Sequence, residues 1–376
     1  STLLASSAAS DVYKRQIYNN GSELTISGSN ISNSSIVASE TEALTSAGNA
    51  FGGAIYNIGN GLRIDTTSFT GNTASTDGDG GSALGGAIYS SGDVTLGGGV
   101  EFSGNRDGAG ANDIYFQSGG LIVNGLKSEN ANVISSGLAS AGTSSVTVTD
   151  NGKLILNGDN RRFTGNAVVG ENSSLTYGGT ISNSILAQTN VTGNNGTVEF
   201  DFDDQRYDGL DAGMITTAAG VSGHFVKSGS GTLVLDSGDY SGFSGDVTVN
   251  GGTLEFSGTN YFSNASSNTV NTGASLIYTS STDNTMSNLQ GGGNFTKNGS
   301  GDLTLTGNDT NKFTGNAVIN GGDLIANYEN GTFFAPSATV NLNSSGLQYT
   351  TLNANNLSGG NFSSINLADG AVFLSL

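Results

Sequence analysis

The chain has 376 residues, including 60 Gly, 1 Pro, 12 Lys and Arg, 31 Asp and Glu, and no Cys or Trp. Abundant Gly without Pro excludes collagen and a Pro-rich linker, and the lack of Cys excludes a disulfide scaffold and a cysteine-ligated metal site. The formal net charge of −19 disfavours nucleic acid and anionic lipid as partners, and no run of residues approaches the roughly 18 apolar residues of a transmembrane helix.

The N-terminal segment 1–16, STLLASSAASDVYKRQ, does not resemble the sequence that follows it. It is similar to translated adapter sequence found at the ends of metagenomic reading frames. Ile17-Tyr18-Asn19 matches the end of a Gly-Gly-Ala-Ile-Tyr-Asn motif, with Lys-Arg-Gln in place of the first three positions. We therefore expect residues 1–16 to be a non-native leader and the true N-terminus to be missing, and we exclude this segment from fold prediction.

Residues 17–125 contain one kind of repeat. The motif Gly-Gly-Ala-Ile-Tyr occurs at 52–56 and again at 85–89. Phe69-Thr-Gly-Asn72 recurs with the same offset as Phe102-Ser-Gly-Asn105. A short alternating segment follows each Ile-Tyr pair, and these segments are expected to be strands: 24–26, 62–64 and 94–96.

Residues 126–376 contain a second kind of repeat, built from pairs of apolar segments joined by Gly-, Ser- and Asn-rich loops. Individual loops gain or lose a residue, yet the leading and closing leucines of each unit keep one identical separation: Leu154 and Leu175, Leu233 and Leu254, Leu303 and Leu324. This constancy indicates a coil of fixed circumference. A phenylalanine in each connecting loop is expected to fold back into the coil: Phe163, Phe243 and Phe313.

Repeats of about 20–50 residues indicate a solenoid, a propeller or an array. Gly or Asn interrupts the chain so often that a helical solenoid is excluded, and a propeller blade needs about 40 residues and four strands. We predict an all-β fold, an elongated parallel β-helix (β-solenoid), with apolar columns inside and Gly or Asn at the corners. It divides into a β-helix over 17–125 and a second over 126–376.

Few residues suggest catalysis. His224 is the only histidine, so a Ser-His-Asp triad would have to use it, but no Gly-x-Ser-x-Gly segment accompanies it. It lies beside an expected strand and is predicted to be structural and exposed to solvent. We therefore predict no catalytic residue and no cofactor.

The densest charge cluster runs from 199 to 211. Asp201 and Asp203 alternate with phenylalanines, so their side chains are expected to project outward together. With Asp208 they are the best candidates for a Ca²⁺ site, or for the carboxylates of a glycan-cleaving β-helix. Only Arg206 accompanies them as a cation, and the pattern favours a solvated strand face with no metal. The Asp-Gly-Asp-Gly-Gly loop at 77–81 lacks the further ligands of a known calcium loop.

These motifs resemble a known family. The Gly-Ser-Gly-x-Leu-x-Leu…Phe-x-Gly…Val-x-Val-Asn-Gly-Gly-x-Leu unit is similar to the autotransporter-associated β-strand repeat of type V secretion passenger domains. The Gly-Gly-Ala-Ile and Phe-x-x-Asn pairs resemble the repeats of chlamydial-type polymorphic outer-membrane proteins. The resemblance implies a right-handed β-helix displayed on the surface of a Gram-negative bacterium. It also implies outer-membrane anchoring through a C-terminal β-barrel, which we expect to be missing from this chain.

The resemblance favours an adhesin or structural stalk in cell–cell or cell–host contact over an enzyme. The expected partners are host or bacterial surface glycans or proteins. Two alternatives stay open: a polysaccharide lyase or hydrolase on the same scaffold, and self-association that leads to aggregation or biofilm.

Overall fold

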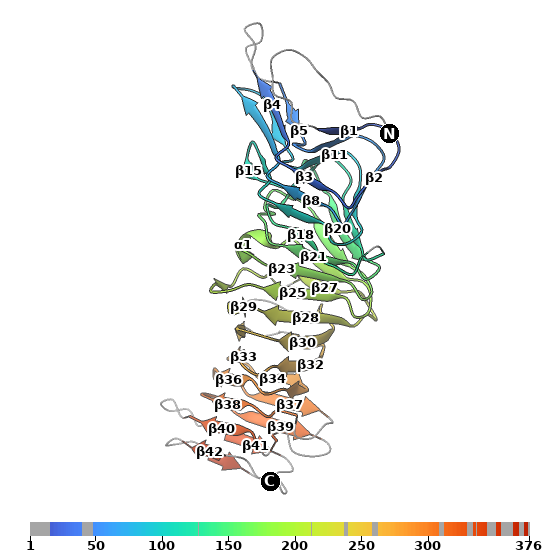
Figure 1. The fold of residues 1–376 in the computed structure, drawn as a ribbon. Coiled ribbons are helices and arrows are strands. Elements are labelled where there is room, and N and C mark those ends of the chain that lie inside the picture. The colour runs from blue at the N-terminus through green and yellow to red at the C-terminus, as the bar shows by residue number, and fades with distance from the viewer. Residues whose placement is uncertain are drawn as a thin grey trace. The chain divides into compact units, whose positions relative to one another are not determined.

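The computed structural model describes residues 16–39, 48–126, 128–211, 213–236, 240–257, 262–307, 312–328, 334–335 and 337–343, and the strands Thr351–Ala354, Ser364–Leu367 and Val372–Leu374. The expected leader lies outside the described residues except for Gln16. The described chain is all-β apart from one short helix, α1 (Ile181–Ser184) (Figure 1). It forms two compact units, Ser1–Gly196 and Thr197–Leu376.

Three long parallel sheets form the N-terminal unit, and successive coils of the chain add strands to each of them. Sheet 1 contains β1 (Ile17–Asn19), β6 (Ile55–Asn57), β11 (Ile88–Ser90), β16 (Ile114–Phe116) and β19 (Leu138–Ser140). Sheet 2 contains β2 (Leu24–Ser27), β7 (Leu62–Asp65), β12 (Val94–Leu96), β17 (Leu121–Asn124), β20 (Ser145–Thr149), β22 (Asn166–Val169) and β24 (Thr189–Val191). Sheet 3 contains β3 (Asn30–Ser32), β8 (Ser68–Thr70), β13 (Glu101–Ser103), β18 (Asn132–Ile134), β21 (Lys153–Leu156) and β23 (Ser174–Tyr177).

Two smaller sheets extend the first coils of this unit. One contains β4 (Ser35–Ser39), β9 (Thr73–Asp77), β14 (Arg106–Asp107) and β15 (Gly110–Ala111), and the other pairs β5 (Ala50–Phe51) with β10 (Ala83–Leu84). A small core of Ala50, Ala74 and Ala83 packs between them. The β14–β15 pair is antiparallel, whereas the other pairs in these two sheets are parallel. The segment 73–84, which departs from the repeat, therefore belongs to this extension.

The C-terminal unit also consists of stacked parallel strands. Its first series contains β25 (Thr197–Asp201), β28 (Gly223–Ser228), β30 (Gly245–Val249), β32 (Ala265–Val270) and β35 (Leu289–Gln290). The second contains β26 (Arg206–Tyr207), β29 (Thr232–Leu235), β31 (Thr253–Ser257), β33 (Ser275–Thr279), β36 (Asn294–Asn298), β38 (Asn316–Ile319), β40 (Thr339–Leu342) and β42 (Ser364–Leu367). The third contains β34 (Asn284–Ser287), β37 (Leu303–Gly307), β39 (Leu324–Tyr328), β41 (Thr351–Ala354) and β43 (Val372–Leu374). A short strand, β27 (Ile215–Thr217), precedes β28.

The predicted parallel β-solenoid is confirmed at the level of register. Each pair of leucines predicted to lie one coil apart is directly paired: Leu154 with Leu175, Leu233 with Leu254, and Leu303 with Leu324. In the first repeat, Ile55 pairs with Ile88, and Phe69 pairs with Phe102. Equal sequence spacing therefore becomes vertical stacking, because parallel strands hydrogen-bond residue by residue between coils.

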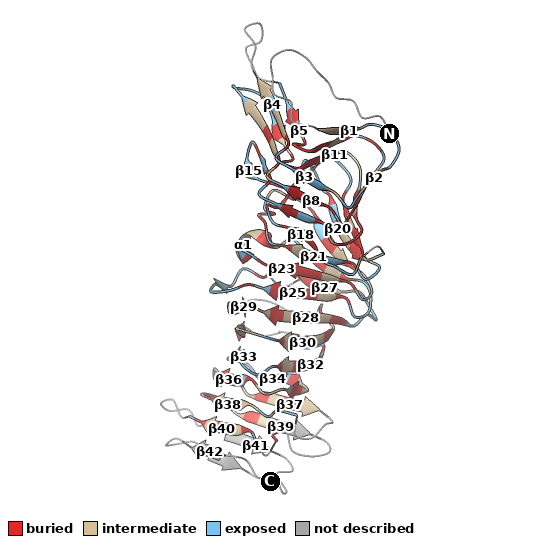
Figure 2. Cartoon of the chain, viewed as in Figure 1, coloured by how far each residue is buried: buried red, intermediate tan, exposed pale blue. Residues whose placement is uncertain are grey.

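The core is the continuous interior of each solenoid unit. Figure 2 shows buried residues alternating with less buried ones along the strands, as strands with one buried face require. The three loop phenylalanines predicted to fold inward are buried, with exposures of 5% for Phe163 and 0% for Phe243 and Phe313. Asparagine amides also hydrogen-bond from coil to coil at corners, as in Asn271 to Asn250 (2.7 Å) and Asn320 to Asn298 (2.8 Å).

The predicted boundary between residues 125 and 126 separates two kinds of sequence repeat and stays a prediction. The division of the chain into two compact units falls at a different place, after Gly196. Within the described part of the chain, no helix has the length and apolar character needed to cross a membrane.

Candidate functional site

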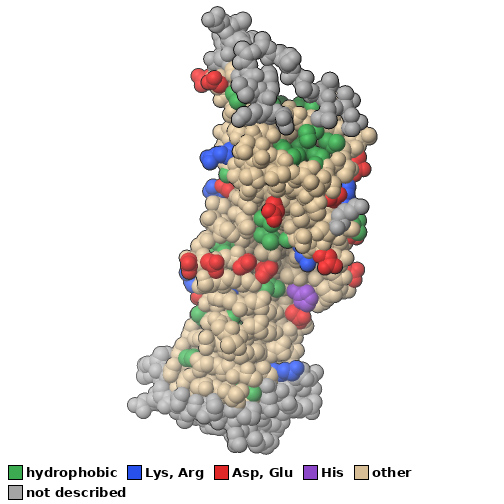
Figure 3. Space-filling view, viewed as in Figure 1, with side chains coloured by type: hydrophobic (Ala, Val, Ile, Leu, Met, Phe, Trp, Pro, Cys, Tyr) green, Lys and Arg blue, Asp and Glu red, His purple; other side chains and the backbone are tan. Residues whose placement is uncertain are grey.

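The acidic cluster has the alternation that the sequence predicts. Phe200 and Phe202 are buried, with exposures of 0% and 3%, whereas Asp201 and Asp203 are exposed. Figure 3 shows a row of acidic side chains on this face at the level of β25. The backbone N–H of Ser230 donates to Asp203 Oδ1 at 2.7 Å, and its hydroxyl donates to the same atom at 3.0 Å. These bonds lower the pKa of Asp203 because they stabilise its charged form.

The two cations of this region hydrogen-bond to groups outside the acidic cluster. Arg206 donates to Glu255 Oε2 at 2.7 Å, and Lys227 is fully buried. Within the described residues, no three His, Cys, Asp or Glu side chains gather so that they could hold a metal ion. Asp201, Asp203 and Asp208 as calcium ligands therefore stay an untested prediction.

His224 lies in a column of outward-facing polar side chains across three strands. It pairs in register with Asp246, which pairs with Ser267. His224 Nδ1 lies 3.6 Å from Asp246 Oδ2, while the hydroxyls of Ser266 and Ser267 donate to Asp246 Oδ1 at 2.6 and 2.8 Å. A Ser-His-Asp relay needs the serine hydroxyl on the histidine, but here both hydroxyls bond to the carboxylate.

Two buried lysines are the main feature that the sequence-based prediction lacks. Lys297 Nζ donates to Gly301 O and Gly321 O, both at 2.6 Å, and to Gly299 O at 3.4 Å. Lys227 Nζ donates to Ser228 O and to Gly229 O (3.2 Å). Both side chains are 0% exposed, so each ammonium is held by corner carbonyls inside the solenoid.

The environment of both lysines lowers their pKa to about 8, chiefly because burial disfavours the charged amine. Nearby aspartates oppose this effect in each case. Lys227 also lies 4.5 Å above the ring of Phe202, in a cation–π contact. A period-two pattern would have revealed both lysines, because each stands two positions after an inward phenylalanine.

Two further charged groups are buried in the N-terminal unit. Asp113 is 0% exposed; Asn105 Nδ2 donates to its Oδ1 at 2.8 Å, and the N–H of Ser136 donates to its Oδ2 at 2.6 Å. Burial raises the pKa of Asp113 to about 6 despite these bonds. Arg162 binds Asp107 with two bonds of 3.0 and 2.9 Å, and the Asp107 side chain is fully buried. Both carboxylates therefore bind protein groups that are distant in sequence, Ser136 for Asp113 and Arg162 for Asp107.

A tyrosine ladder lies on the outer face of sheet 1. Tyr18, Tyr56, Tyr89 and Tyr115 pair in register, each next to an isoleucine that points inward. Consecutive ring centroids are 5.4, 5.3 and 5.7 Å apart, and Phe51 stacks on Tyr89 at 4.5 Å. Tyr18 is the most exposed of the four, at 38%. Figure 3 shows a hydrophobic patch in the region of β1 and β11.

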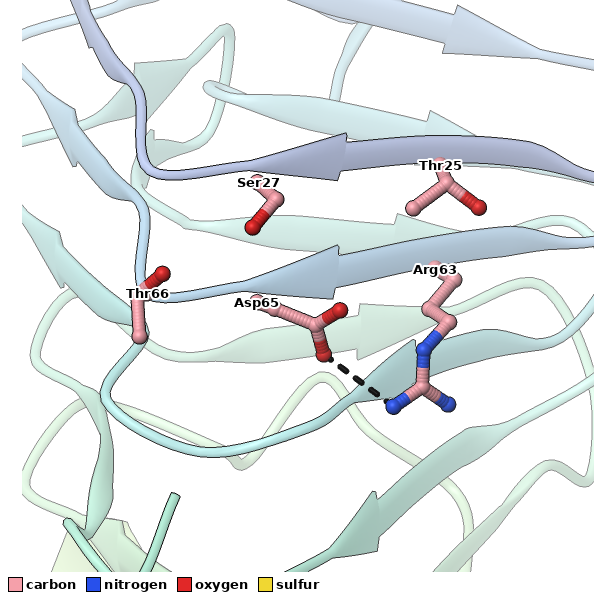
Figure 4. A pocket seen from close by; sticks show the side chains of 5 residues that line it. All are labelled: Thr25, Ser27, Arg63, Asp65 and Thr66. Atoms are coloured by element: carbon pink, nitrogen blue, oxygen red, sulfur yellow. Dashed lines mark hydrogen bonds and ion pairs between the residues drawn. The ribbon is translucent and has the colours of Figure 1, made fainter. Parts of the chain in front are cut away.

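A surface cavity of about 520 Å³ lies on sheet 2, where β2 and β7 run side by side. Thr25 and Ser27 of β2, Arg63 and Asp65 of β7, and Thr66 line it. Figure 4 shows Thr25, Ser27, Arg63 and Asp65 on the two strands and Thr66 on the turn after β7, with a dashed line from Arg63 to Asp65. Arg63 Nη2 donates to Asp65 Oδ1 at 3.2 Å. This site is absent from the sequence-based prediction because most of its residues are short polar side chains within ordinary strands.

The fold and these surfaces define a parallel β-solenoid whose inward positions are almost entirely occupied by scaffold residues. Two segments of the C-terminal unit, residues 225–256 and 295–326, match the family model of the passenger-associated-transport-repeat. Comparison with curated proteins and with solved structures gave no match. The chain is thus a β-solenoid that carries two passenger-associated-transport repeats, which confirms the expected resemblance to autotransporter passenger domains. The resemblance of the N-terminal repeats to chlamydial-type proteins stays a prediction.

Proposed function

We propose that the chain is part of a surface-displayed autotransporter passenger that acts as an adhesin or structural stalk. The observation that carries this proposal is the pair of passenger-associated-transport repeats at 225–256 and 295–326 within a solenoid of parallel strands. In such a scaffold the inward face of each strand packs in the core, so residues that bind a partner have to lie on the outer faces or on the side extensions.

The described geometry supports a non-enzymatic role. The only histidine lies beside Asp246, and the nearby serine hydroxyls bond to that carboxylate and not to the imidazole. Both cations near the acidic cluster hydrogen-bond to groups outside it. The tyrosine ladder and the cavity on sheet 2 give the outer surface features that suit binding. The expected partners are surface glycans or proteins of host or bacterial cells, and the expected location is the outer surface of a Gram-negative cell.

Surface display is tested on intact source cells. An antibody raised against the purified chain should label unpermeabilised cells, and external protease should remove that label. Adhesion is tested with beads that carry the purified chain, which should bind target cells more strongly than beads that carry albumin. Labelling only after permeabilisation would overturn display, and release of unsaturated uronates from pectin by the purified chain would overturn the non-enzymatic role.

A further inference from the structure

We propose that the cavity between β2 and β7 binds a neutral, hydroxyl-rich ligand, namely one sugar residue of an uncharged glycan. The inference rests on the proposed adhesive function and names its ligand class and its site. Strand register places the lining residues together, because Thr25 lies directly opposite Arg63, and Ser27 lies opposite Asp65. Alternate residues of a strand share a face, so all four side chains point to the same side.

The charges of the cavity select a neutral ligand. Arg63 and Asp65 form an ion pair at 3.2 Å, so the cavity carries one positive and one negative group. An anionic ligand would meet the Asp65 carboxylate in a chain whose net charge is −19, and a cationic ligand would meet the guanidinium. A neutral ligand avoids both repulsions.

The unused hydrogen-bonding capacity matches hydroxyl groups. A guanidinium has five N–H donors, and Arg63 bonds to Asp65 through one nitrogen, Nη2. The second carboxylate oxygen of Asp65 accepts no bond from the described protein, while the side chain is only 8% exposed. Hydroxyls of Thr25, Ser27 and Thr66 both donate and accept. A sugar hydroxyl, which also donates and accepts, can bond to each of these groups.

Two backbone features shape the cavity. Gly97, in the next coil, lies under the ion pair, and a Cβ at that position would overlap Asp65 Oδ1 and crowd Arg63 Nη2. Thr66 at the rim has a φ of 43°, a left-handed conformation that is a genuine outlier for a β-branched residue. The stacked corners of the neighbouring coils have Gly28 (φ 58°) and Gly98 (φ 112°), so Thr66 places a side chain at a turn where those coils have none.

The same two coils carry an aromatic surface on the neighbouring sheet. β1 and β2 belong to one coil, and β6 and β7 belong to the next, so Tyr18 and Tyr56 lie on the sheet that precedes the cavity in both coils. Tyrosine offers a rigid apolar ring and a polar hydroxyl, a combination suited to binding surfaces. The apolar C–H faces of sugar rings suit the ring, which favours a glycan chain over a single small polyol.

The test uses the purified chain on a printed array of neutral oligosaccharides and matched uronic-acid and sialylated glycans. We expect binding to neutral glycans. For the strongest neutral oligosaccharide, Asp65→Asn and Arg63→Gln should each weaken binding at least about tenfold, because each removes a hydrogen bond to a charged group. Asp159→Asn, which breaks an exposed Arg161–Asp159 pair in the same unit, should leave binding unchanged.

Thr25→Val serves as a further cavity variant, because Thr25 is exposed and its loss does not threaten folding. It should also weaken binding, since it removes a hydroxyl from the cavity wall. Binding that is confined to charged glycans, or that is unchanged in the cavity variants with an unaltered thermal midpoint, would overturn the inference. The adhesion assay separates this result from the proposed function. Beads that adhere to cells and are not displaced by the neutral glycan would leave adhesion standing and overturn the glycan site.

Discussion

Replacing Lys297 with Met should weaken the C-terminal unit strongly. In the wild type the ammonium donates to two carbonyls at 2.6 Å, one on Gly301 and one on Gly321, which lies in the next coil. Methionine fills a similar volume but donates nothing, so both carbonyls lose a buried partner. Each lost partner costs about 1–3 kcal/mol. Removing an ammonium that burial already disfavours offsets part of this cost, so we expect a net loss of about 2–4 kcal/mol.

Lys227→Met is the matched control for this substitution. Lys227 is equally buried, yet its bonds go to Ser228 and Gly229, its own neighbours in sequence. Its hydrogen bonds therefore fix one corner, and it reaches the adjacent coil through the cation–π contact with Phe202 rather than through a hydrogen bond, so its loss should cost about half as much.

Hydrogen–deuterium exchange with mass spectrometry measures the difference locally, as a solenoid unit requires because its coils open separately. In Lys297→Met, amides of β36 and β38 should exchange about 30- to 700-fold faster, the equivalent of about 2–4 kcal/mol. Lys227→Met should change β28 and β30 less. Equal or larger acceleration in Lys227→Met would refute the idea that Lys297 joins adjacent coils.

The same lysines predict a rise in stability with pH. Burial lowers the pKa of both to about 8, whereas the unfolded chain keeps the ordinary value near 10.5. Between about pH 8 and 10 the unfolded state therefore binds more protons, and stability rises by at most about 1.4 kcal/mol per pH unit for each lysine. Denaturant unfolding followed by tyrosine fluorescence from about pH 7.5 to 9.5 should show this slope in the wild type and not in the double Met variant. Equal slopes would contradict it.

The remaining predictions concern the N-terminal unit. Arg162→Met removes the cation beside the buried Asp107 carboxylate, which then keeps the N–H of Ala109 as a partner, and should cost about 3–5 kcal/mol in denaturant unfolding. Asp113→Asn should also destabilise, by about 2–4 kcal/mol, because both carboxylate oxygens accept N–H bonds and an amide places a donor against one of them. Wild-type stability should fall from about pH 4 to 6 relative to this variant, since a pKa raised to about 6 keeps a proton on the folded state. Gly97→Ala should displace the cavity ion pair and abolish glycan binding, whereas Gly142→Ala, with open space around it, should not.

The architecture could be predicted from spacing because a parallel solenoid converts a constant repeat length directly into register. Leu233 and Leu254 pair as the separation shared by all three leucine pairs requires, and Ile17 pairs with Ile55 as the truncated motif suggests. The side sheets could not be predicted in this way. Ser35 of β4 pairs with Thr73 of β9 at the same offset as Ile17 with Ile55, but no repeated sequence motif marks these segments as strands.

The buried lysines were harder to predict because the signal for their burial is their position in the inward–outward alternation of the strand, and not their residue type. Lys227 lies two positions after the inward Phe225, and the equivalent position in the first repeat is Val148, so alternation alone places the lysine inside. Charge suggested the opposite, since lysine is rarely buried unless it is paired. The corner carbonyls resolve the conflict, because they supply the partners that make burial tolerable, and such partners become visible only once coils are stacked.

The same alternation explains the cavity on the outer face of sheet 2. Arg63 and Asp65 are two positions apart, so a strand places both outside, and Gly97 stands where the next coil would otherwise fill the space between them. From the sequence alone, a glycine in a repeat of strands predicts a corner, and its role beside a cavity is recognised only when the residues stacked on it in the adjacent coil are known. In a solenoid, therefore, the scaffold can be predicted from the sequence pattern of a single coil, whereas a binding surface depends on which residues of two adjacent coils lie side by side.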